Sequence, residues 1–136
     1  MMKRITLLLL LGVTFISCTT LVSCDKNNEL TQEQEAQKLQ QMLSEIENMA
    51  GSINCEDSAN WTYTPLGKKA CGGPKGYLAY PTTIDTVKFL SLVEAYKTAE
   101  ERYNNKWGII STCDLPPVPF GVTCENGKAV LVYQGL

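Results

Sequence analysis

Apolar residues recur every three or four positions in two separate stretches of the chain, which predicts two amphipathic helices. Thr31 and Gln34 have the form of a capping box, so we expect the first helix to run from Thr31 to Ala50. The second should span about Ile84 to Lys106 and end at Gly108. The first stripe is Leu39, Met42, Leu43, Ile46 and Met49, and the second is Phe89, Leu92, Val93, Tyr96, Ala99, Tyr103 and Trp107.

Between and after the helices the pattern changes to strand-like alternation. Residues 61–64 and 77–80 flank a turn-rich segment, and residues 118–124 and 128–133 flank Asn126-Gly127, a pair typical of a type I′ hairpin. We therefore predict an α+β fold in which the two amphipathic helices pack on a small antiparallel sheet of about four strands.

The amino-terminal segment has the pattern of an export signal, with a basic start (residues 1–4) and an apolar run (residues 5–16). Leu21-Val22-Ser23-Cys24 resembles the lipobox of bacterial lipoproteins. That resemblance implies that diacylglycerol is attached to Cys24, that cleavage removes residues 1–23, and that a further acyl chain such as palmitate is added. A plain secretory peptide or a membrane-spanning helix are the alternatives, but hydroxyl residues from Ser17 onward interrupt the run. Cys18 is a second, less suitable acylation point.

This interpretation divides the chain into a signal peptide (1–23), a lipidated cysteine with a polar tether (24–30) and one small domain (31–136). We expect the mature protein to be held by lipid on a membrane of the bacterial cell envelope, the outer membrane above all, on its periplasmic or surface face. Loss of Lys3 and Arg4 with the signal changes the formal net charge from −2 to about −4. An acidic domain without a basic stripe argues against nucleic acid as a partner.

Four cysteines remain in the domain: Cys55, Cys71, Cys113 and Cys124. In an exported small domain this even count predicts two disulfides. Three pairings are possible, and we favour Cys55 with Cys71 and Cys113 with Cys124, since each pair flanks one turn-rich segment. A zinc site is the competing interpretation, but the chain has no close cysteine pair and no histidine, so we expect no metal.

Candidate chemistry for catalysis is sparse. There is no histidine, the acids are scattered over helix faces, and the cysteines have expected partners. The segment Cys71-Gly72-Gly73-Pro74 lacks the spacing of a phosphate-binding loop, and a disulfide-anchored turn is the better interpretation. We therefore expect no enzymatic activity and no cofactor.

The Cys-Gly-Gly-Pro core carries a second resemblance. Together with Tyr77-Leu78-Ala79-Tyr80, a long helix containing Tyr96 and Glu100, and the terminal cysteines, it is similar to small secreted bacterial proteins without an assigned function. The resemblance covers roughly residues 55–130. It implies a disulfide-linked exported domain and transfers no activity or binding residues.

A proline-rich segment between Cys113 and Cys124 is suited to recognition. Its three prolines restrict the chain, so Leu115, Val118 and Phe120 would be presented in a preorganised loop, with Trp61 and Tyr63 as neighbouring aromatics. Alternatively, the prolines only guide an edge strand and prevent aggregation. Two functions follow: a lipid-anchored binding or inhibitory module that uses this loop, or a structural envelope lipoprotein that assembles through the helix of residues 31–50.

Overall fold

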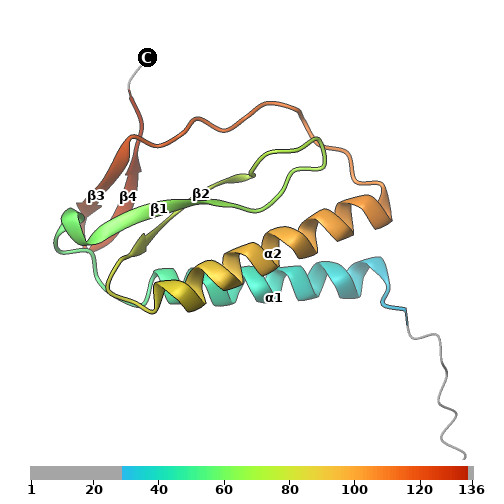
Figure 1. The fold of residues 1–136 in the computed structure, drawn as a ribbon, viewed down its shortest axis with the longest axis horizontal. Helices are drawn as coiled ribbons and strands as arrows, with labels where there is room; N and C mark the ends of the chain where they lie inside the picture. Colours follow the sequence, from blue (N-terminus) through green and yellow to red (C-terminus); the bar gives the residue numbers. More distant parts are fainter. Residues whose placement is uncertain (1–28, 135–136) are drawn as a thin grey trace, which may run out of the picture.

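The computed structural model describes residues 29–134, so the predicted signal peptide, lipobox and Cys24 lie outside the described residues. Two long helices alternate along the chain with two hairpins, in the order helix, hairpin, helix, hairpin (Figure 1). None of the described helices is long and apolar enough to cross a bilayer. The elements are α1 (Gln32–Ala50), the short 3-10 helix η1 (Ser58–Asn60), β1 (Trp61–Leu66), β2 (Gly76–Pro81), α2 (Thr86–Trp107), β3 (Gly121–Glu125) and β4 (Lys128–Val132).

Both predicted helices are confirmed. The capping box forms at the start of α1, where the Gln34 amide donates to Thr31 Oγ1 at 3.3 Å and the Thr31 amide donates to Gln34 Oε1 at 3.0 Å. Asp85 caps α2 by accepting from the Lys88 amide, and Gly108 ends it in the left-handed conformation at φ 60°. α2 begins two residues later than expected, because Asp85 rather than Pro81-Thr82-Thr83 supplies the cap.

The two helices lie side by side and form one layer, and the β1–β2 hairpin covers one face of that layer (Figure 1). Ile46 of α1, Tyr80 of β2 and Phe89 of α2 meet in the core, with the Tyr80 and Phe89 rings 4.5 Å apart between centroids. Leu66 and Leu78 share the Tyr80 face of the hairpin and pack against this core. The apolar stripes of both helices are therefore used within the domain.

The single four-stranded sheet predicted from the sequence is wrong. β1 pairs with β2 and β3 pairs with β4, each antiparallel, and these are two separate two-stranded sheets. The segment leading into β3 contains Pro116, Pro117 and Pro119, which have no amide hydrogen to donate to a neighbouring strand. β3 accordingly begins at Gly121 rather than Val118. The expected Asn-Gly turn is present, with φ 52° at Asn126 and 76° at Gly127.

Two disulfides form, but the favoured pairing is also wrong: Cys55 bonds to Cys124 and Cys71 bonds to Cys113. The chain brings the α1–β1 connection beside the terminal hairpin, where the Cys55 amide donates to the Gly127 carbonyl at 2.9 Å. Cys113 follows α2, at the end where the β1–β2 loop lies. The bonded cysteines are 69 and 42 residues apart in the sequence. A single disulfide that closes a loop of either size stabilises a fold by about 4 kcal/mol, because it lowers the entropy of the unfolded chain.

Candidate interaction surface

Residues 109–120, which we call the strap, connect α2 to β3 without helix or strand structure. In Figure 1 the strap passes over the β1–β2 hairpin on the side away from the helices. Four of its large apolar side chains are mostly exposed: Ile110 by 93%, Leu115 by 69%, Val118 by 66% and Phe120 by 74%. Isolated exposed apolar residues are common, but four of them in one short segment make the strap a candidate interaction surface.

The second half of the strap faces the domain through two of its prolines. Pro119 is buried and Pro116 half-buried, whereas the residues between and beside them are exposed. Prolines restrict the backbone of this segment. Leu115, Val118 and Phe120 are therefore presented to solvent from a restricted chain.

The first part of the strap is fastened to the loop between β1 and β2, residues 67–75. The Cys71–Cys113 disulfide joins them, the Cys71 amide donates to Ser111 Oγ at 3.1 Å, and Lys69 Nζ donates to the Asp114 carbonyl at 2.6 Å. Lys69 also pairs with the Asp114 carboxylate at 3.2 Å. Hydrogen bonding from Thr112, followed by that from Lys69, lowers the pKa of Asp114 below its usual value. The strap is thus held covalently and by polar contacts.

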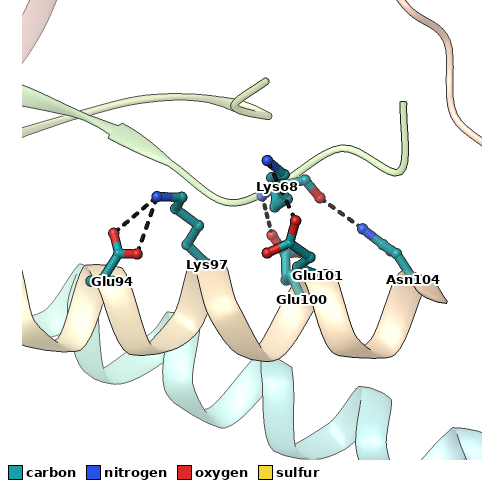
Figure 2. A network of polar contacts seen from close by, with 6 residues as sticks. All are labelled: Lys68, Glu94, Lys97, Glu100, Glu101 and Asn104. Carbon is teal, nitrogen blue, oxygen red and sulfur yellow. Dashed lines mark hydrogen bonds and ion pairs between the residues drawn. The ribbon is translucent and has the colours of Figure 1, made fainter. Parts of the chain in front are cut away.

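Loop 67–75 is in turn fixed to α2 by Glu100, the one buried charged residue among residues 29–134, at 3% exposure. Its carboxylate accepts hydrogen bonds from the Lys68 amide at 2.7 Å, Lys75 Nζ at 2.6 Å and the Tyr96 hydroxyl at 2.8 Å. Figure 2 shows Glu100 below Lys68, flanked by Asn104, whose amide donates to the Lys68 carbonyl at 2.9 Å. Three donors compensate the burial of this charge.

Two further features show how closely the loop fits Glu100. Gly67 has φ 74°, and a Cβ added there would lie 2.6 Å from Glu100 Oε2, so only glycine is accommodated. Burial, together with the hydrogen bond to Glu100, raises the pKa of Tyr96 well above its usual value. Tyr96 therefore remains a hydrogen-bond donor across the physiological pH range.

The far end of the strap is fixed by the terminal hairpin. The Phe120 amide donates to the Val132 carbonyl at 2.6 Å, which extends the β3–β4 ladder by one bond. The Cys55–Cys124 disulfide then ties β3 to the α1–β1 connection. Leu115, near the middle, lies over Gly73, where an added Cβ would approach Leu115 Cδ2 to 2.6 Å. The backbone of the strap is therefore constrained while its apolar side chains stay exposed.

Of the residues proposed for recognition, Leu115, Val118 and Phe120 share this one exposed segment. Trp61 and Tyr63 lie on β1, on the face of the hairpin opposite Leu66 and Tyr80, and both are half-buried. Tyr63 packs edge-on against Tyr77 with ring centroids 5.9 Å apart. The two β1 aromatics are therefore less accessible than the three residues of the strap.

Sequence reasoning missed Ile110, and it named Glu100 only within a resemblance and gave it no role. Ile110 follows the helix-ending Gly108 and belongs to no periodic pattern. Glu100 had a signal: it lies four residues after Tyr96 and seven after Val93, on the buried stripe of α2. By contrast, Glu94 and Lys97, three residues apart on α2, form an exposed ion pair at 3.1 Å (Figure 2).

Comparisons with protein-family models, with curated proteins and with solved structures gave no match. The geometry of the chain's own residues therefore carries the functional argument. Within the described part of the chain, the four core cysteines are bonded to one another, and the Glu100 carboxylate is occupied by three donors. Both arrangements hold the strap in place.

Proposed function

We propose that the protein is an exported, lipid-anchored binding module of the bacterial cell envelope that engages a protein partner through the strap. The observation that carries this proposal is the exposure of Leu115, Val118 and Phe120 on a segment fixed at both ends. A preordered loop loses little conformational entropy on binding, so most of the apolar contact contributes to affinity. A partner with an apolar groove would cover these side chains.

A protein partner suits this surface better than a lipid surface. The strap carries Asp114 and no basic residue, whereas peripheral membrane contact is strengthened by lysine and arginine. The lipid at Cys24 would supply membrane attachment in any case, by the lipobox resemblance. The strap is then free to recognise an exported protein, and inhibition of that protein is one consequence of such binding.

The alternative function, assembly through α1, has weaker support. The apolar residues Leu39, Met42, Leu43 and Met49 pack against the core of the same domain, and Ile46 is buried in it. The apolar surface of α1 is thus largely used within the domain, apart from the parts of Leu39 and Met42 that line a groove against α2. Deletion of residues 31–50 would remove part of the core, so a partner lost with that deletion would not distinguish assembly from unfolding.

The test is a pull-down from envelope and culture-supernatant fractions with the oxidised chain carrying Cys24→Ser. Leu115→Ala/Phe120→Ala is compared with Val87→Ala/Leu90→Ala, a matched change at two exposed apolar residues of α2. We expect one protein to be captured by the parent and the α2 variant and lost with the strap variant. Equal capture by all three, or loss with both variants, would contradict recognition through the strap.

A further inference from the structure

A groove lies between the first half of α1 and the second half of α2, with a volume of about 340 Å³. Its lining is mostly apolar and also includes three basic side chains and Glu35. The apolar and aromatic lining residues are Leu30, Leu39, Met42, Ala99 and Tyr103, and the basic ones are Lys38, Arg102 and Lys106. Apolar surface beside cationic side chains is the chemistry that binds an anionic amphiphile.

The three basic residues are not equivalent. Lys106 is paired with Glu35 at 2.8 Å and Glu29 at 2.9 Å, and the Glu35 contact is the main cause that raises the pKa of Lys106. Lys38 and Arg102 are exposed and form no ion pair with any of residues 29–134. In a chain of negative net charge, these two free cations at one groove are a local site for an anion.

The groove is also placed where the chain enters the domain. Leu30, which lines it, follows Cys24 by six residues, a distance of about 20 Å at most when extended. The start of α1 and the end of α2 lie together at one end of the domain, and the β3–β4 hairpin lies at the other (Figure 1). A lipid at Cys24 would therefore keep the groove close to the membrane surface.

We propose that this groove binds the headgroup and upper acyl region of an anionic phospholipid in the anchoring membrane, an inference that rests on the lipid anchor of the proposed function. The phosphate would lie between Lys38 and Arg102, and the glycerol and first methylenes would contact Leu39, Met42 and Ala99. The anchor makes this contact intramolecular and so raises the occupancy of the groove above that set by its intrinsic affinity for free vesicles. Such binding directs the β3–β4 end of the domain away from the bilayer.

The core lies wholly within residues 31–132, so the test uses residues 24–136 with Cys24→Ser and without lipid. Sedimentation is measured with phosphatidylcholine vesicles and with vesicles that also contain phosphatidylglycerol. We expect binding only to the second, weakened roughly tenfold or more by Lys38→Glu/Arg102→Glu. The control Lys88→Glu/Lys128→Glu makes the same change in net charge at exposed positions away from the groove and should bind nearly as the parent does.

A second readout locates the lipid. Trp107 lies beside the groove, with Lys106 Nζ 4.9 Å from its ring centroid and its Nε1 donating to Glu35 at 2.8 Å. In Trp61→Phe, Trp107 is the remaining tryptophan, and brominated phosphatidylglycerol should quench it. Equal binding to both kinds of vesicle, equal loss in the two charge variants, or unquenched Trp107 with bound lipid would each overturn the site.

This test and that of the proposed function can fail separately. Vesicle binding is measured without the lipid at Cys24 and without the partner, so its failure removes the groove site and leaves recognition by the strap untouched. Loss of partner capture in the strap variant is in turn independent of Lys38 and Arg102. If Cys24 were shown to carry no lipid, vesicle binding by the groove would still be measured, but the argument from local concentration would fall.

Discussion

The core and the strap contain similar apolar side chains in opposite environments. Phe89 is completely buried and Ile46 is 1% exposed, whereas Phe120 is 74% and Leu115 69% exposed. The core is held together by the apolar contacts themselves. The strap is instead held by a disulfide, by hydrogen bonds and by prolines, so its apolar side chains are not needed to keep it in place.

Under the proposed function, this difference separates the residues that stabilise the fold from those that bind a partner. In the core, each apolar side chain contributes to folding through the surface that it removes from water. In the strap, the apolar side chains stay in water in the free protein, so the free energy of burying them can still be gained when a partner covers them. The fold can therefore keep its structure while the exposed residues of the strap change. The following predictions compare buried residues that stabilise the fold with more exposed ones that do so less.

The largest expected effect is that of Phe89→Ala. Phe89 packs against Tyr80 in the centre of the core, and truncation of a buried phenylalanine leaves a cavity. We expect the free energy of unfolding to fall by about 3–5 kcal/mol. Urea denaturation of the oxidised chain, followed by circular dichroism, measures this change.

The matched substitution in the strap is Phe120→Ala, which removes the same atoms from an exposed position. Its effect on the free energy of unfolding should stay within about 0.5 kcal/mol. Comparable losses for the two variants would mean that Phe120 supports the fold, and the strap would then be part of the core.

A smaller effect is expected from Glu100→Gln, which tests how the strap is held. The amide keeps the shape of the side chain but loses the charge that accepts from Lys75 and from the Lys68 amide. Because hydrogen bonds to buried charged groups contribute more than neutral ones, we expect a loss of about 2–3 kcal/mol in unfolding free energy. Amide hydrogen exchange in residues 67–75 should accelerate as the loop loosens.

Glu101→Gln is the control for this change on the same helix. Glu101 is exposed and lies 3.7 Å from Lys68 Nζ, so its loss should cost at most about 0.5 kcal/mol and leave exchange in the loop unchanged (Figure 2). If both variants behaved alike, the loop would not depend on a buried carboxylate.

The elements could be predicted from the sequence, but the pairing between distant elements could not. Helical periodicity, the Thr31 cap and the Asn126-Gly127 turn are local signals, and each predicted its element correctly. Disulfide connectivity depends on which loops meet in space. Cys55 meets Cys124 because the terminal hairpin returns to the α1–β1 connection, and nothing near Cys55 in the sequence encodes that return.

The candidate surface was predicted only in part, because some of its features are local in the sequence and others depend on contacts between distant residues. Prolines and apolar residues between Cys113 and Cys124 are visible in the sequence and indicated Leu115, Val118 and Phe120. The anchoring of the strap was not predicted, because it needs Lys69 and Cys71, more than forty residues earlier, to lie beside Asp114 and Cys113. The groove between α1 and α2 likewise depends on how the two helices pack.

The smallest expected effect concerns Glu35, a half-buried carboxylate that contrasts with the fully buried Glu100. Hydrogen bonds from Lys106 and then Trp107 lower the pKa of Glu35 below 4.5, so its charged form is favoured by folding. The stabilisation is therefore present above pH 4.5 and is lost as the pH falls through the lower pKa of the folded state. Glu33 is the control, because both acids lie in the first turn of α1 and interact with the same helix dipole. At neutral pH, Glu35→Gln should lower the urea midpoint slightly more than Glu33→Gln, because the Glu35 carboxylate also accepts hydrogen bonds from Lys106 and Trp107. As the pH falls through the lowered pKa of Glu35, the charge of Glu35 is lost and the difference between the two midpoints should shrink. A difference that persisted at acid pH would show that the Glu35 side chain stabilises the helix pair by packing rather than by its charge.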